Sequence, residues 1–145
     1  MKAKEFFQRA RSAEQDIKRL ERLLEHYSSV GASISSKWGG VGSGRYNTHS
    51  QVETGVIGAI MAERGIYDEL SRYRQIVAET ENVISRVPQD RFRQILTLHY
   101  LAGMSLAVVA KTLGYQHTEN LYRAHGWALR EAQKIIDGRE TDGHK

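Results

Sequence analysis

The chain has 145 residues, of which 40% are hydrophobic and 26% charged, with a net charge of +4, one proline and no cysteine. This composition is typical of a soluble globular protein rich in long helices, and it excludes disulfides, thiolate metal sites and a thiol nucleophile. No apolar run approaches the ~20 residues that cross a bilayer, and the first residues lack the apolar stretch of a signal peptide. We therefore expect an all-α, cytoplasmic protein that does not contact a membrane.

The first part of the chain predicts a long helix followed by a loop. Over residues 3–28, apolar side chains alternate spacings of four and three residues, as in the seam of a helix that packs against a partner helix. The members of this seam are Phe6, Ala10, Ala13, Ile17, Leu20, Leu24 and Tyr27. Glycines and serines dominate residues 29–51, so we expect the helix to end near Gly31 and a loop to follow.

A second helical pattern over residues 52–86 predicts a long helix that returns antiparallel to the first. Its apolar positions are Val56, Ile60, Tyr67, Leu70, Val77 and Ile84. Residues 1–87 are therefore expected to form a helical hairpin that serves oligomerisation or partner docking. The first seam is longer than this patchy second face can cover, and we expect a homodimer for that reason.

The last part of the chain predicts three shorter helices. Pro88 ends the preceding helix and suits the first turn of the next one. Gly103 and Gly114 suit left-handed turns after a helix, and Ser105 suits an N-cap. The expected elements are helices over 88–102, 106–113 and 118–136, followed by a flexible tail over 137–145. On the last helix the expected buried line is Leu121, His125, Ala128 or Leu129, Ala132 and Ile136.

Two short helices, a tight turn and a helix with an exposed polar N-terminal half form the pattern of a helix-turn-helix DNA reader. Residues 86–145 hold 9 basic against 6 acidic side chains, whereas residues 1–85 hold 12 against 11, so the basic excess lies with this reader and suits double-stranded DNA. Arginine reads guanine and asparagine reads adenine in such proteins. The candidate DNA contacts are Ser105, Lys111, Gln116, His117, Thr118, Asn120, Tyr122, Arg123, Trp127 and Arg130. An ordinary solvated helix face is the alternative interpretation.

No motif indicates an enzyme. The glycine-rich residues 39–46 lack the Lys-Ser/Thr pair of a phosphate loop, and the histidines are too dispersed for a zinc site. His99 and His125 are expected to be half-buried in the helical core. We therefore expect no catalytic residues, cofactor, metal or small-molecule substrate.

The residues from Arg91 to Leu106, with Val109-Ala110 and Leu113-Gly114-Tyr115, resemble region 4 of sigma factors. The closing segment His125-Gly126-x-Ala128-Leu129 is similar to ArpU-type phage and prophage transcriptional regulators, which join an N-terminal helical region to a sigma-like reader. The resemblance covers residues 88–136 well and 1–87 only loosely. Between Tyr115 and His125 this chain is about one residue longer than the family pattern, and this leaves open a second register in which Glu119 or Trp127 faces the groove in place of Arg123.

The resemblance implies a phage-type transcriptional regulator that binds promoter DNA through residues 88–136, while the hairpin dimerises or docks RNA polymerase. Two alternatives stay open on the sequence. One is a DNA-packaging adaptor of the small-terminase kind, which also joins a helix-turn-helix to helical oligomerisation. The other is an interaction protein that binds polymerase or a sigma factor without binding DNA.

Overall fold

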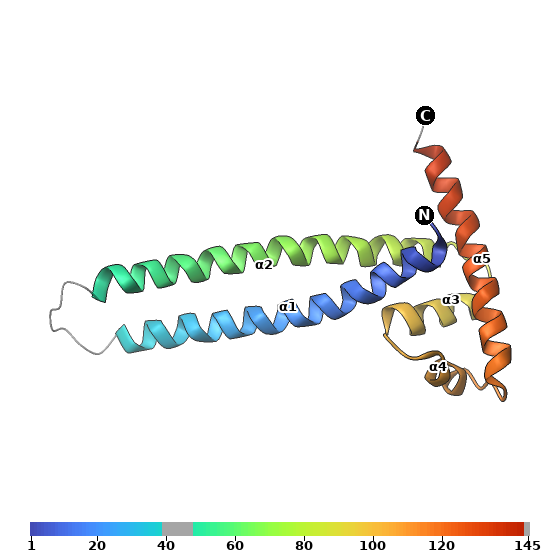
Figure 1. Cartoon of the computed structure of the whole chain (residues 1–145), viewed down its shortest axis with the longest axis horizontal. Coiled ribbons are helices and arrows are strands. Elements are labelled where there is room, and N and C mark those ends of the chain that lie inside the picture. The colour runs from blue at the N-terminus through green and yellow to red at the C-terminus, as the bar shows by residue number, and fades with distance from the viewer. Residues whose placement is uncertain (39–47, 144–145) are drawn as a thin grey trace. The chain divides into compact units, whose positions relative to one another are not determined.

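All secondary structure in the described part of the chain is helical (Figure 1). The computed structural model describes the backbone of residues 1–38 and 48–143 and the side chains of residues 1–30, 55 and 57–143. The elements are α1 (Ala3–Trp38), α2 (Thr48–Ser85), α3 (Asp90–Leu96), a π-helical turn η1 (Thr97–Leu101), α4 (Leu106–Thr112) and α5 (Thr118–Asp142). Among the helices described, none combines the length and apolar character that a membrane span requires.

Three helix ends differ from the sequence-based expectation. The loop expected over residues 29–51 is shorter, because α1 continues to Trp38 and α2 begins at Thr48; its central residues 39–47 lie outside the described part. The tail expected over 137–145 is helical as far as Asp142. The ends of α1 and α5 extend beyond the expected positions for the same reason. An isolated glycine, Gly31 in α1 or Gly138 in α5, costs a helix only about 1 kcal/mol and does not end it.

The start of α3 also differs from the expectation. Pro88 was expected in the first turn, but Gln89 is the N-cap, with φ −84° and ψ 123°, and the helix begins at Asp90. The guanidinium of Arg93 donates to the carbonyls of Val87 at 2.6 Å and Pro88 at 3.1 Å. Arg93 therefore satisfies backbone acceptors just beyond the end of α2, where no helical N–H can reach them.

The described residues form two compact units, Asp16–Arg72 and the combination of Met1–Gln15 with Tyr73–Lys145. This division differs from the expected boundary near residue 87. The reason is that the start of α1 and the end of α2 supply side chains to the same core as the later helices, including Phe7 and Val83, which are both fully buried.

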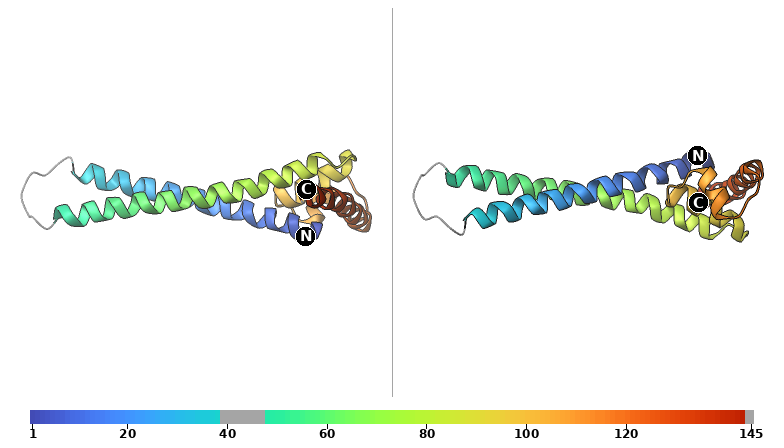
Figure 2. Two further views of the ribbon diagram at one scale, coloured as in Figure 1. Left: turned by 90° about the horizontal axis from the view of Figure 1, so that it is seen from above. Right: turned by 90° about the horizontal axis from the view of Figure 1, so that it is seen from below.

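In the unit Asp16–Arg72, α1 and α2 run side by side in opposite directions (Figures 1 and 2). The expected seam is buried at Ile17 and Leu20 on α1. On α2 the expected position Leu70 is buried, but the expectation was wrong at Ile60 and Tyr67, which are 46% and 59% exposed, while Ile66 is buried. The expected Val56 lies outside the described side chains. This helix carries apolar side chains on two faces, so spacing alone did not distinguish the packed face from the exposed one.

In the other unit, a first core brings together side chains from α1, α2, α3, η1 and α5. Its buried members are Ala3, Phe6, Phe7, Val83, Ile84, Val87, Leu96, Tyr100, Ala128, Ala132 and Ile136. The rings of Phe7 and Tyr100 stack at 5.2 Å between centroids, with an angle of 27°. A second core joins α3, α4 and α5, the helices that carry the candidate site. Its buried members are Ile95 of α3, Val109 and Ala110 of α4, and Leu121 and Ala124 of α5.

Candidate nucleic-acid interface

Ser105 fixes the start of α4, as the sequence predicted. Its backbone is extended, with φ −65° and ψ 154°, and its hydroxyl oxygen accepts a hydrogen bond from the Val108 N–H at 3.3 Å. This is the geometry of an N-cap, which satisfies one of the backbone donors left without a partner at the first turn. The preceding Gly103 has φ 75°, in the left-handed region expected for it.

The turn between α4 and α5 is built around Gly114, which has φ 78°. The Tyr115 N–H donates to the Ala110 carbonyl at 2.8 Å, and the Gly114 N–H donates to the Lys111 carbonyl at 3.2 Å. These two bonds make a Schellman motif, which ends a helix sharply and satisfies its last carbonyls. The half-buried Leu113 and Tyr115 pack against the second core, so the turn is anchored by apolar contacts as well as by hydrogen bonds.

Arg91 of α3 supports this turn, and the sequence analysis did not find that role. Its guanidinium donates to the Leu113 carbonyl at 3.0 Å and lies 5.5 Å from the centroid of the Tyr115 ring. A cation next to the C-terminal carbonyls of α4 also suits the negative end of the helix dipole. The two partners are 22 residues apart in the chain, so local spacing carries no signal for the contact.

The two faces of α5 differ as the sequence predicted. Leu121, Ala124, Ala128, Ala132 and Ile136 are buried, and His125 is half-buried beside them. Every candidate DNA contact is exposed, including His117, which is the N-cap of α5 but makes no side-chain capping bond. The hydroxyl oxygen of Ser105 is occupied in part by its capping bond.

Arg123, Trp127 and Arg130 follow one another on α5 at spacings of four and three residues, so they share one side of the helix. The side chains of Lys111, Arg123 and Arg130 form no hydrogen bond or ion pair within the part of the chain that the structure describes. By contrast, Arg91 and Arg93 donate to backbone carbonyls. Three unpaired cations thus lie in the segment predicted to be the reader, whereas Arg139, near the end of α5, is also unpaired among the described residues and lies outside that segment.

Large apolar side chains are exposed on the same two helices. Val108 of α4 is 47% exposed, and Tyr122 and Trp127 of α5 are 53% and 52% exposed. Exposed aromatic rings next to unpaired cations are suited to binding a partner, because the rings add apolar contact area and the cations add long-range attraction.

Two histidines, His99 of η1 and His125 of α5, link η1 to the neighbouring helices. The His99 Nδ1–H donates to the Met104 carbonyl at 2.7 Å, because a carbonyl can only accept; its Nε2 faces an Arg11 nitrogen at 3.4 Å. The Tyr100 hydroxyl and His125 Nε2 are 2.9 Å apart. Both histidines are half-buried, as expected from the sequence.

The pKa values in this cluster follow from burial. Burial lowers the pKa of His125 to about 4, with smaller contributions from His99 and Lys4, and it raises the pKa of Tyr100 to about 12. The pKa of His99 is also lowered, mainly by burial. At neutral pH His125 is therefore uncharged.

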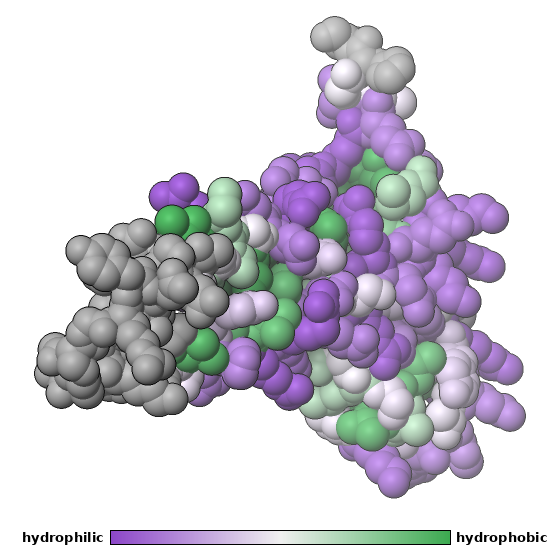
Figure 3. Space-filling view, turned by 60° about the vertical axis from the view of Figure 1, so that its left-hand side comes forward, coloured by the Kyte–Doolittle hydropathy of each residue, from purple (hydrophilic) through white to green (hydrophobic). Residues whose placement is uncertain are grey.

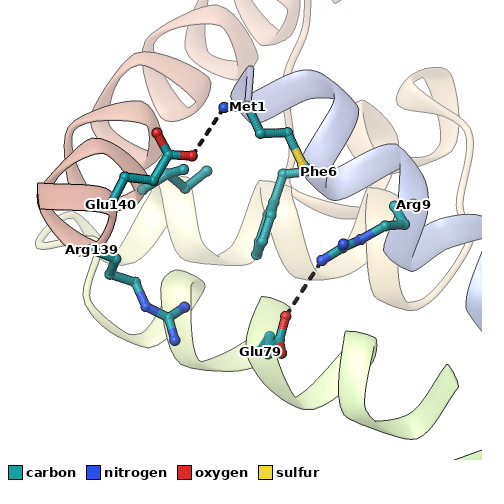
Figure 4. Close-up of a pocket in the computed structure, with 7 residues that line it drawn as sticks. Met1, Phe6, Arg9, Glu79, Arg139 and Glu140 are labelled. Carbon is teal, nitrogen blue, oxygen red and sulfur yellow. Dashed lines mark hydrogen bonds and ion pairs between the residues drawn. The ribbon is translucent and has the colours of Figure 1, made fainter. Parts of the chain in front are cut away.

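A cavity of about 270 Å³ lies where the ends of α1, α2 and α5 meet (Figure 4). The amino group of Met1 pairs with Glu140 at 3.0 Å, and Arg9 pairs with Glu79 at 3.4 Å while its guanidinium lies over the Phe6 ring. Four of the charged groups that line the cavity are thus paired with one another. They tie the first turns of α1 to α2 and α5.

No cluster of potential metal ligands is present among the described residues. No known protein family, no curated protein and no solved structure matches this chain.

Proposed function

We propose that this protein is a sequence-specific DNA-binding transcriptional regulator of phage or prophage type that reads promoter DNA with the exposed face of α5. In this proposal α4, the Gly114 turn and α5 form a helix-turn-helix, and α1 and α2 form the antiparallel hairpin. The observation that carries the proposal is the unpaired set Lys111, Arg123 and Arg130, exposed on the two helices of a sharply turned helix pair.

The polar groups on α5 suit base recognition. Asn120 and Arg123 lie in the first two turns, where a recognition helix contacts base edges, and both are exposed. An arginine can donate two hydrogen bonds to guanine, and an asparagine can bond adenine through its amide. Lys111 lies in the last turn of α4 beside the Gly114 turn, where a contact to a phosphate is natural. The resemblance of residues 88–136 to sigma factor region 4 is what favours transcription over other DNA transactions.

A second candidate function is favoured by the exposed apolar side chains Val108, Tyr122 and Trp127. A surface that combines three such side chains with arginines is also suited to docking a protein. The partner would then be RNA polymerase or a sigma factor, and no binding to DNA would be required.

Two variants test the DNA proposal. Arg123→Ala should weaken binding to a selected DNA site by about 1–3 kcal/mol and relax the preference at one position, because it removes a base contact. Lys111→Ala should weaken binding to all DNA about equally and reduce the slope of log affinity against log salt by about one, because it removes one phosphate contact. Lys18→Ala, an exposed lysine of α1 far from the reader in the chain, is the matched control and should leave the slope unchanged.

Fluorescence anisotropy on a selected and a scrambled site at several salt concentrations separates the candidates. If Trp127→Ala or Glu119→Ala shifts the base preference and Arg123→Ala does not, the second register of α5 is correct. If no variant changes binding to either DNA, the DNA proposal fails and the protein-docking function takes its place. Ring-shaped oligomers of many subunits would instead favour a packaging adaptor.

A further inference from the structure

Most of the apolar seam of α1 is covered by the chain itself and offers little surface for dimerisation. Phe6, Ala10, Ala13, Ile17 and Leu20 are buried, and Leu24 and Tyr27 are half-buried. Most of the exposed large apolar side chains described in the unit Asp16–Arg72 lie on α2. They are Ile57, Ile60, Met61 and Tyr67, which are 57%, 46%, 68% and 59% exposed, and Val30 of α1 is 36% exposed.

These four side chains form one stripe, here called the α2 stripe. At about 100° per residue they fall within a sector of roughly 120°, and this sector is rotated by roughly 140° from the buried Ile66 and Leu70. Figure 3 shows apolar side chains at the surface beside the grey atoms of this part of the molecule. Arg64 lies between Met61 and Tyr67 in this sector, and a side of a helix that combines several half-exposed apolar side chains with few charges is suited to contact with another molecule.

We propose that the α2 stripe is the interface through which two copies of this chain pair, with their α2 helices antiparallel. A twofold axis beside Ala62 places Ile57 of one copy opposite Tyr67 of the other, and the reverse, while Met61 of both copies lies near the axis. The stripe is thus complementary to itself, as an isologous interface requires. Ile60 lies opposite Arg64, whose methylene stem can cover it.

Charge favours the antiparallel direction. Arg64 and Asp68 lie within the sector of the stripe, and neither forms a hydrogen bond or ion pair with the residues that the structure describes. A parallel pair would place Arg64 of one chain against Arg64 of the other, and Asp68 against Asp68, and both contacts are repulsive. In the antiparallel pair the two Asp68 side chains are ~18 Å apart along the axis. At a rise of 1.5 Å per residue the two Arg64 side chains are ~6 Å apart along the axis, and each also lies ~4.5 Å along the axis from Glu63 of the other copy, whose opposite charge offsets part of this repulsion.

The size of the stripe sets the strength of the pairing. Two copies contribute eight apolar side chains, each about half exposed before contact, which places the interface near or below the small end of specific interfaces, ~1,200 Å² in total. We therefore expect a dimer that dissociates on dilution into the micromolar range. This inference does not depend on DNA binding, so it stands or falls separately from the proposed function.

Sedimentation of the full chain between about 1 and 100 μM tests the interface, a range chosen around typical weak dimers. The unsubstituted protein should change from monomer to dimer across this range, and Met61→Glu should remain a monomer, with its dissociation constant raised at least tenfold. Val30→Glu is the matched control, because Val30 is an exposed apolar residue of α1 in the same unit, and it should dimerise normally. Circular dichroism checks that each variant keeps its helices. A protein that stays monomeric throughout, or a Met61→Glu variant that dimerises normally, would overturn the proposal.

Cysteine cross-linking tests the direction, and the chain is suited to it because it contains no cysteine. Ile57→Cys and Tyr67→Cys proteins are oxidised separately and as an equal mixture. Antiparallel pairing predicts a disulfide-linked dimer in the mixture and monomers in each separate sample, since a disulfide needs Cα atoms within about 7 Å. Cross-linking of each variant with itself would instead show parallel helices and overturn the proposed arrangement.

Discussion

Acidification should destabilise this protein through His125. In the folded chain burial holds the pKa of this imidazole at about 4, whereas its ordinary value is 6.5. Between these two values the unfolded chain binds a proton that the folded chain does not. Folding stability therefore rises with pH in this window; the contribution of His125 is fully present above pH 6.5 and is lost as the pH falls towards 4.

The magnitude follows from the two pKa values. A single group with these values makes the free energy of unfolding about 2 kcal/mol lower at pH 5 than at pH 7.5. The ring is only partly buried, so water screens part of this effect and about 1–2 kcal/mol is the expected change. His99 acts in the same direction, because its pKa is also lowered by burial. The groups that face this pair are Lys4 and Arg11 of α1.

Urea unfolding at pH 5 and at pH 7.5 measures the effect. His125→Gln offers an acceptor to the Tyr100 hydroxyl but does not titrate, so we expect a smaller loss of stability on acidification than in the unsubstituted protein. His117→Gln, at an exposed position, is the matched control and should preserve the full pH dependence. Equal pH dependence in the unsubstituted protein and His125→Gln would refute the assignment of a neutral, buried imidazole.

Two further predictions concern the turn and the long helix. Gly114→Ala should lower the free energy of unfolding by about 1–2 kcal/mol because φ is 78° at this position. Gly65→Ala should raise the free energy of unfolding by about 0.5–1 kcal/mol, because an added Cβ meets nothing within 4 Å in the helix. Thermal unfolding of both variants measures these changes, and changes of the same sign would contradict the reasoning. Arg91→Met should speed hydrogen exchange at the Tyr115 amide because the Leu113 carbonyl loses its partner, while Arg91→Lys should restore part of the protection. Unchanged exchange in Arg91→Met would show that the turn does not depend on this contact.

The parts of the fold with local signals could be predicted from the sequence. Ser105, Gly103 and Gly114 each determine the backbone through their own chemistry, and the structure places all three as expected. The exposed side of α5 followed from the helical period, since a helix with Leu121, Ala128 and Ala132 on one side presents the intervening residues to solvent. Ala124, which is also buried, was not predicted.

Features that depend on distant partners could not be predicted in this way. Phe7 lies outside the seam that runs through Phe6, yet it is fully buried because Tyr100 stacks on it from η1. The last turns of α5 are held by Glu140, which pairs with the amino group of Met1 at the other end of the chain. The π-helical turn at Thr97–Leu101 also carried no signal; the Ala102 N–H bonds the Thr97 carbonyl there at 2.9 Å.

The five lysines and arginines between Asp90 and Arg130 fall into two groups with different consequences for DNA binding. Arg91 and Arg93 are committed to carbonyls of the α4 and α2 ends, so their charge holds the fold. Lys111, Arg123 and Arg130 have no such commitment among the described residues. The net charge of this part of the chain therefore overstates the number of cations that are available to bind a polyanion such as DNA. If Lys111 and Arg130 each neutralise one phosphate while Arg123 contacts a base, the slope of log affinity against log salt is about −2 per reader, and a pair of chains joined through the α2 stripe would double it on a symmetric site. A slope much steeper than this would mean that further cations also contact the DNA phosphates.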